Sequence, residues 1–273
     1  MIQRLLLVHA HPDDESITTG GTIARYAAEG VEVTLVTCTL GEEGEIIPPG
    51  LEQLGSWAAD QLGGYRFGEL SLACAALGLG AHRYLGGAGR WRDSGMAGTA
   101  AAAHARAFAG GTVAGQTAQL TAILDEVRPQ VVITYDAFGG YGHPDHIRAH
   151  EITMAAAPAA ESVARVFHVV SSERATSQGL AALRERPDFG FRVADEGELP
   201  VTPDDRITTR VDVSAYLAAK RTALRAHRTQ VNVPADDCFT LSNDIAQPIP
   251  PYEYFVLAHG EPDGAGTDLF GGL

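Results

Sequence analysis

Two kinds of hydrophobic pattern alternate along the N-terminal half of the chain. Residues 4–10 and 31–37 are short runs dominated by leucine and valine, which is typical of strands buried on both faces. Between them, residues 22–29 have the spacing of a helix that ends at Gly30. A strand, a helix and a second strand in this order predict a βαβ unit with a right-handed crossover.

The alternation continues beyond this unit. It predicts helices over residues 60–77, 117–127 and 147–157, and strands over residues 82–85 and 130–135. Weaker patterns predict further strands near 163–170, 206–213 and 254–257, and a helix over 215–227. These elements together indicate an α/β fold with a mostly parallel sheet flanked by helices.

Three segments have other patterns. Residues 97–118 are rich in alanine and glycine and are compatible with either a helix or a loop. Residues 196–205 and 247–251 have the composition of surface connections. Because none of these segments divides the chain clearly, we expect a single domain over residues 1–273.

Composition narrows the classes of function. Hydrophobic residues make up 45% of the chain, enough for a large core, but no apolar run has the length of a membrane span. The first residues lack the features of a signal peptide, so we expect a cytoplasmic protein with no membrane partner. A net charge of −14 argues against nucleic acid as a partner. Lys220 is the single lysine, which excludes a Schiff base elsewhere, and the three cysteines are too far apart for a CxxC pair.

Two short polar segments follow predicted strands and carry the candidate chemistry. Ala-His-Pro-Asp-Asp-Glu occupies residues 10–15, and Tyr-Gly-His-Pro-Asp-His occupies residues 141–146. Alone, each is more typical of a polar turn in which Asp caps a helix. In open parallel sheets, however, binding sites form at the carboxyl ends of strands. Two such segments at two strand ends therefore predict one shared cleft.

The residue types in these segments suit a catalytic metal. His11 and Asp14 are three residues apart at a turn, and His146 can supply a third ligand from the second segment. Two imidazoles and one carboxylate leave one coordination position open, as in catalytic zinc sites, where the pKa of bound water falls to about 7. Iron(II) is an alternative ion for the same ligands.

Four neighbouring residues are candidates for catalysis. Asp13 adjoins two predicted ligands and is free to act as a general base. His143 can protonate a leaving amine or stabilise an oxyanion, and the Tyr141 hydroxyl can donate to the same oxygen. Asp145 can hydrogen-bond a histidine and fix its tautomer.

Longer motifs around these residues resemble a known family. The segment at 10–15, Thr-Cys-Thr-Leu-Gly-Glu-Glu-Gly-Glu at 37–45 and Gly-Gly-Tyr-Gly-His-Pro-Asp-His at 139–146 resemble the PIG-L/LmbE family of zinc-dependent N-deacetylases. Residues 60–66 and 84–96 resemble the branch that deacetylates N-acetylglucosaminyl-inositol in mycothiol biosynthesis. The motifs cover roughly the first 150 residues, and the C-terminal half adds less.

The resemblance implies specific roles. It implies a Rossmann-like α/β fold and a Zn²⁺ ion held by His11, Asp14 and His146. It implies that Asp13 acts as base, His143 as acid and Tyr141 near the carbonyl oxygen. For the substrate, a small amino-sugar inositol, it suggests that Arg66 and Asp93 hold hydroxyl groups and that Glu45 is a further contact.

Several alternatives stay open at this point. Within the family they are a mycothiol S-conjugate amidase or a deacetylase of another GlcNAc conjugate. We expect a lysine shortly after residues 11–16 in the amidase branch, where this chain has Ile17, Thr18 and Thr19. Outside the family, they are a non-haem iron oxygenase, which uses the same ligand types, and a non-catalytic sugar- or nucleotide-binding module. A homo-oligomer is neither required nor excluded by the sequence.

Overall fold

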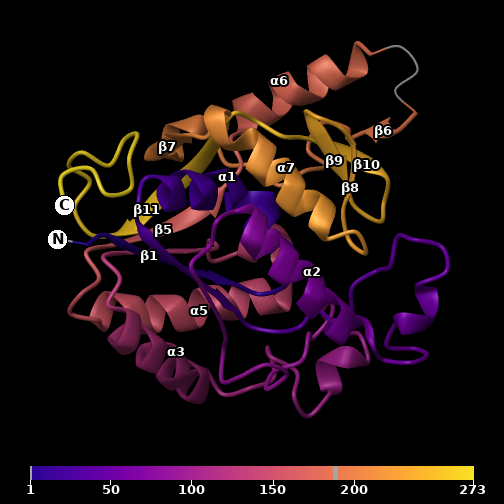
Figure 1. The fold of residues 1–273 in the computed structure, drawn as a ribbon, viewed down its shortest axis with the longest axis horizontal. Helices are drawn as coiled ribbons and strands as arrows, with labels where there is room; N and C mark the ends of the chain where they lie inside the picture. The colour runs from indigo at the N-terminus through magenta and orange to yellow at the C-terminus, as the bar shows by residue number, and fades with distance from the viewer. Residues whose placement is uncertain (1, 187–189) are drawn as a thin grey trace.

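A seven-stranded sheet forms the centre of the molecule (Figure 1). The computed structural model describes residues 2–186 and 190–273. The strand order is β3-β2-β1-β4-β5-β11-β7; the first five strands are parallel, and β11 is antiparallel to both of its neighbours. The bounds are β1 Arg4–His9, β2 Glu32–Thr37, β3 Ala81–Tyr84, β4 Val131–Thr134, β5 Arg165–Val170, β7 Thr209–Asp212 and β11 Tyr252–His259.

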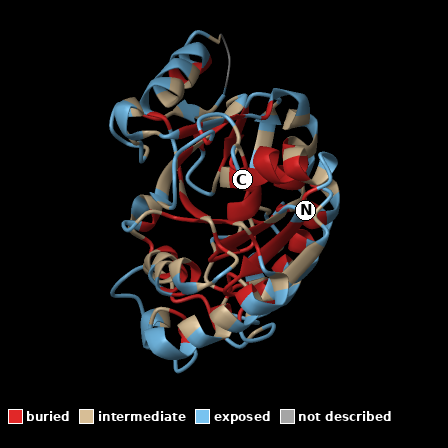
Figure 2. Cartoon of the chain, turned by 90° about the vertical axis from the view of Figure 1, so that its left-hand side faces the viewer, coloured by how far each residue is buried: buried red, intermediate tan, exposed pale blue. Residues whose placement is uncertain are grey.

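Helices cover both faces of this sheet, as Figure 1 shows. On one side lie α1 (Asp14–Ala28), α2 (Leu62–Ala76) and α7 (Leu217–Ala226), with α7 in contact with both of the others. On the other side α3 (Val113–Val127) packs against α5 (Pro144–Ala156). Because both faces are covered, the side chains of β4 and of β1 after Arg4 are buried whichever way they point, and the buried residues concentrate along the sheet (Figure 2).

A smaller four-stranded sheet lies in the C-terminal half. Its order is β6-β10-β9-β8, with β6 Arg192–Val193, β10 Ile245–Pro248, β9 Cys238–Thr240 and β8 Asn232–Ala235. The helix α6 (Glu173–Arg184) packs against β10, and both lie away from the main sheet in Figure 1. Small clusters of buried side chains, separate from the main core, hold this part together.

The α/β class and the mostly parallel sheet are as expected from the sequence, and each predicted helix and strand is present with shifted ends. The helix expected from residue 22 begins eight residues earlier, at Asp14. Gly20 and Gly21, which precede the expected start, lie inside the helix. Residues 97–112 form a loop that includes a short 3-10 helix at Ala101–Ala103, and α3 begins at Val113.

Part of one expectation is wrong. Residues 247 and 248 are not a surface connection but the end of β10, where they pair with β9. The sequence patterns also gave no indication of α6 or of the small sheet. No helix in the described ranges combines the length and the apolar character that a membrane span requires.

The strand order places β1 at a switch point. From β1 the chain crosses to β2 on one side, whereas β4 lies on the other side of β1. In open α/β sheets such a point leaves a crevice at the carboxyl ends of the two strands, where ligands bind. Both polar segments predicted to carry chemistry leave the sheet there.

Candidate metal centre

The two histidine-containing segments meet at this crevice. Residues 10–13 connect β1 to α1, and residues 135–143 connect β4 to α5, so the segments start from adjacent strands. They form one end of a cavity of about 680 Å³, whose remaining wall comes largely from the C-terminal half. The residues of that wall include Lys220, Gln230, Phe239, Leu241, Ser242 and Tyr252.

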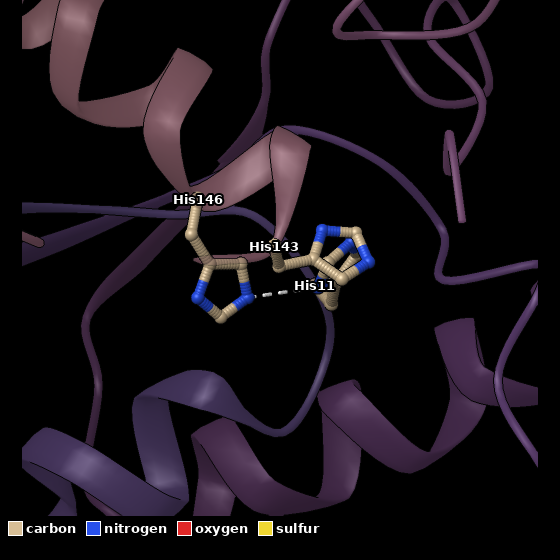
Figure 3. Close-up of side chains that lie close together, drawn as sticks. All are labelled: His11, His143 and His146. Carbon is tan, nitrogen blue, oxygen red and sulfur yellow. Dashed lines mark hydrogen bonds between the residues drawn. The ribbon is translucent and has the colours of Figure 1, made fainter. Parts of the chain in front are cut away.

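The three predicted ligands lie within a few ångströms of one another. His146 Nε2 is 3.2 Å from His11 Nδ1, the contact drawn as a dashed line in Figure 3. Asp14 completes the group, with Oδ2 3.6 Å from His11 Nδ1 and Oδ1 3.5 Å from His146 Nε2. All three side chains are buried, and His11, Asp14 and His146 line the cavity.

The outer nitrogens of the two rings fix the tautomers. His11 Nε2 faces Asp145 Oδ2 at 3.3 Å, and His146 Nδ1 faces the carbonyl oxygen of Gly139 at 3.2 Å. Each of these nitrogens therefore carries the proton. The inner nitrogens then direct two lone pairs at each other beside a carboxylate, an arrangement that requires a proton or a cation between them. The donor set therefore fits a divalent ion.

The pKa shifts of His11, His146 and Asp14 show that the buried carboxylates favour a positive charge at this site. Burial lowers the pKa of His11, but Asp93 and Asp145 outweigh it and raise that pKa well above 6.5. Burial lowers the pKa of His146 to about 3, so this ring stays neutral and available as a ligand. The pKa of Asp14 lies well below its usual range because His146 and His11 outweigh the effect of burial.

Other donors are close enough to compete for an ion. His11, His143 and His146 each offer an atom within 4.8 Å of the others, as do His11, Asp93 and Asp145. His143 stands beside His11 in Figure 3, with ring centroids 4.6 Å apart. The distances therefore bring the predicted ligands together, but they do not decide between this ligand set and the set that contains His143.

Asp13 is held beside the predicted ligands in a backbone conformation that few residues adopt, with φ 118°. Its amide donates to Glu15 Oε2 at 3.0 Å, and its Oδ2 accepts from Arg66 Nη2 at 3.0 Å. Burial and the Asp14 charge raise the pKa of Asp13 to about 7, although Arg66 opposes them. A carboxylate with a pKa near 7 at the cavity wall has the properties of a general base.

Arg66, which was expected to hold substrate hydroxyls, instead directs its guanidinium at the turn before α1. Besides Asp13, it donates to the carbonyl oxygens of Pro12 and Gly41, and it is 2% exposed. Arg66 lines the cavity, so a ligand can reach it. Most of the N–H groups of its guanidinium, however, already have acceptors in the protein. Its observed contacts orient Asp13.

His143 and Asp145 flank the predicted ligands. His143 Nδ1 accepts from the Asp145 amide at 3.1 Å, which caps α5 and leaves Nε2 facing Asp93 Oδ1 at 3.9 Å. Burial, followed by repulsion from His11, lowers the pKa of His143 to about 4. Asp145 is fully buried; besides His11, it accepts from the amides of Ser94 and Ala109 and so ties residues 91–109 to the site.

The remaining predicted residues lie along the cavity. Tyr141 is 52% exposed and its ring centroid is 5.0 Å from that of His146. Asp93 is 4% exposed, with Oδ1 3.5 Å from His11 Nε2 and accepting from the Gly95 amide. Glu45 lies at the exposed end of the cavity, where its Oε2 accepts from Ser242 Oγ of the C-terminal half at 2.6 Å.

Sequence reasoning missed two buried contributors. Tyr135, the first residue after β4, contacts both Asp14 and His146. His227, after α7, lies 2.7 Å from Glu15 Oε1 through Nε2, and Glu15 in turn holds the Asp13 amide. A tyrosine at a strand end offered a weak signal, but no local pattern distinguishes His227, because its partner is 212 residues away.

Comparison of this chain with known proteins identifies the family to which it belongs. The PIG-L family, described as GlcNAc-PI de-N-acetylase, matches residues 6–157. A 1D-myo-inositol 2-acetamido-2-deoxy-alpha-D-glucopyranoside deacetylase of Saccharomonospora viridis is 65% identical over 98% of this chain and 100% of that protein. One of the same name from Actinosynnema mirum is 63% identical over 99% of this chain and 97% of that protein. A deacetylase–teicoplanin complex has the same fold, with a TM-score of 0.56 at 19% identity over 94% of this chain and 99% of that one.

Proposed function

The chain belongs to the PIG-L family, and from this premise we propose that it hydrolyses the N-acetyl group of N-acetylglucosaminyl-inositol, giving glucosaminyl-inositol and acetate. One observation carries the proposal: His11, Asp14 and His146 converge at the end of a cavity beside a carboxylate, Asp13, whose pKa is about 7. The relatives that match nearly the whole chain are named for this substrate. We further propose that the reaction takes place in the cytoplasm as a step of mycothiol biosynthesis.

We assign the metal to His11, Asp14 and His146, with zinc as the ion and iron(II) as the alternative. The facing lone pairs of the two rings and the adjacent carboxylate support this set. When bound, a divalent ion supplies Lewis acidity toward water and toward the amide carbonyl oxygen. Asp145 supports the set from outside, because it holds the protonated Nε2 of His11.

Asp13 accepts a proton from the attacking water as the new C–O bond forms. Its raised pKa makes the protonated form accessible near neutral pH. Arg66 keeps the carboxylate oriented and also donates to the carbonyl oxygens of Pro12, in the same turn, and of Gly41, after β2. The base is thus fixed both through its side chain and through its backbone.

His143 gives a proton to the departing nitrogen as the C–N bond breaks. Its Nε2 faces Asp93, whose charge favours the protonated ring. Burial and repulsion from His11 oppose that form and lower the pKa of His143 to about 4, so the protonated ring is a strong acid. The Tyr141 hydroxyl, at the mouth of the cavity, donates to the oxygen that becomes negatively charged.

The cavity beyond the reacting groups holds the sugar and the inositol. Asp93, Glu45 and the cavity edge of Arg66 offer groups that hydrogen-bond hydroxyls. Glu45 and Ser242 meet across the cavity, so a ligand there contacts both halves of the chain.

Acetate release from N-acetylglucosaminyl-inositol tests the proposal. We expect turnover by the zinc-loaded protein, loss of turnover after chelation and recovery on adding zinc. A mycothiol S-conjugate assayed in parallel separates the two branches of the family, and we expect slower cleavage of the conjugate. Oxygen uptake measured in the same reaction should be zero, whereas an oxygenase consumes it.

Preference for the conjugate would assign the chain to the amidase alternative. Full acetate release after complete metal removal would overturn the metal-dependent mechanism. Absence of hydrolysis with every divalent ion would leave a binding module as the better description.

A further inference from the structure

Tyr135 lies between two of the proposed ligands although it belongs to neither polar segment. It follows β4 directly, is 3% exposed and reaches back across the end of β1. Its hydroxyl donates to Asp14 Oδ2 at 2.6 Å and accepts from the Ala10 amide at 2.8 Å. The hydroxyl is therefore fully used, and its direction is fixed by the backbone of the neighbouring strand.

This contact determines which oxygen of Asp14 is free. Oδ2 accepts from the Tyr135 hydroxyl and also from the His11 amide at 2.8 Å. Within residues 2–186 and 190–273, no hydrogen-bond donor reaches Oδ1, which faces His146 Nε2 at 3.5 Å. The two bonds thus restrain the rotation of the carboxylate and present Oδ1, with its lone pairs free, toward His146 Nε2.

The ring of Tyr135 acts on the second ligand. It stacks on the His146 imidazole with centroids 4.2 Å apart and an interplanar angle of 19°. The Gly139 carbonyl holds the same imidazole at Nδ1. His146 is consequently fixed both in the plane of its ring and along the direction of Nε2, which removes the two rotations that would carry the nitrogen away from His11.

We propose that Tyr135 is a positioning residue for the metal centre, which sets the orientation of Asp14 through its hydroxyl and of His146 through its ring. The inference rests on the proposed function, because it takes these residues as ligands. Groups that orient ligands from outside the coordination sphere change metal affinity by 10–100-fold when removed. In this account Tyr135 acts on the metal centre through the two ligands and takes no part in proton transfer.

The test is the Zn²⁺ affinity of Tyr135→Phe, measured by competition with a chromophoric chelator on metal-free protein. The variant keeps the stacked ring and removes the hydroxyl, so Asp14 Oδ2 loses one of the two bonds that fix its orientation and keeps the bond from the His11 amide. We expect affinity to fall about 10- to 100-fold. We also expect the visible spectrum of the Co²⁺-loaded variant to differ from that of the wild type.

Tyr26→Phe is a matched control. The Tyr26 hydroxyl is also buried, donates to a carboxylate, Asp268 Oδ1, at 2.7 Å and accepts from a backbone amide, Leu269, at 2.8 Å. It contacts no proposed ligand. Both variants should lose a similar amount of thermal stability, but Tyr26→Phe should bind Zn²⁺ as tightly as the wild type.

Each possible outcome decides a different point. Wild-type affinity in a folded Tyr135→Phe protein, or an equal loss in both variants, would overturn the inference and leave the deacetylase proposal intact. Failure of the wild type to bind one equivalent of either Zn²⁺ or Fe²⁺ would overturn both. A selective loss in Tyr135→Phe supports the positioning role, and a larger loss in Tyr135→Leu would assign part of it to the stacked ring.

Discussion

Asp13 illustrates how much of the site depends on single residues. Its φ of 118° places the carboxylate beside the ligands, and this conformation is held by Glu15 at the amide and by Arg66 at the side chain. Glu15 is itself anchored by His227. Aspartate and asparagine tolerate positive φ better than other side chains with a Cβ, so the position constrains both chemistry and backbone.

The substitution Asp13→Asn tests the role of the base at this position. Asparagine keeps the shape and tolerates the backbone, whereas alanine would add strain. Because an amide cannot accept the proton, we expect kcat to fall about 10²- to 10⁴-fold with one equivalent of metal retained. Steady-state acetate release together with metal analysis measures both quantities.

Asp60→Asn is the control for this substitution. Asp60 also has a positive φ, of 53°, and is also bonded to an arginine, Arg92, but it lies outside the cavity. We expect its kcat to stay near that of the wild type. A kcat for Asp13→Asn within tenfold of the wild type, or equal losses in the two variants, would remove Asp13 from the base role.

Among single residues, those that lie within a short sequence motif could be predicted. His11, Asp14 and His146 could be named because strand ends and short spacings indicated where they converge, and the structure brings them together. Tyr135 and His227 were not named, because Tyr135 bonds to Asp14 and His227 to Glu15, and each of these partners lies more than 100 positions away. Arg66 was named for the substrate, whereas its observed contacts are with the Asp13 turn.

Among the elements, α1 links the site to the C-terminal half. Glu253 of β11 accepts from the amides of Gly21 and Thr22 in α1, and from Lys220 Nζ of α7 at 2.6 Å. The close approach depends on glycine, because a Cβ at position 21 would lie 2.6 Å from the Cβ of Val213. The helix α1, which begins with Asp14, is thereby held in place by β11, α7 and Val213.

The substitution Gly21→Ala should lower the free energy of unfolding by about 1–3 kcal/mol, because a methyl group must displace Val213. Gly68→Ala, in the middle of α2, meets open space and should raise it by about 0.5–1 kcal/mol, since alanine is the better helix former. Urea unfolding of both proteins measures the difference. Changes of the same sign would show that the packing of α1 against Val213 is not as tight as described.

Helices and strands could be predicted where a hydrophobic pattern within the segment itself indicates them. The strands β1 and β4 are mostly apolar runs and β2 is rich in valine and leucine, and all three were placed within one or two residues. The strands of the small sheet have two to four residues, include two prolines and are stabilised by pairing with distant partners. For α1, the pair Gly20-Gly21 obscured a helix that tertiary packing preserves.

At the scale of the whole molecule, two halves of the chain build one cavity. The five parallel strands carry both polar segments to the switch point between β1 and β4. The C-terminal half closes the cavity and reaches the site through His227 and Ser242. The family match covers residues 6–157, yet relatives align over nearly the whole chain, which agrees with a site that needs both halves.

The most direct test is an anomalous difference map recorded at the zinc absorption edge from crystals of the zinc-loaded protein. We predict one peak at about 2.0–2.2 Å from His11 Nδ1, His146 Nε2 and a carboxylate oxygen of Asp14. A peak bonded to His143 instead of Asp14, or one shared by His11, Asp93 and Asp145, would contradict the assigned ligands and the roles derived from them.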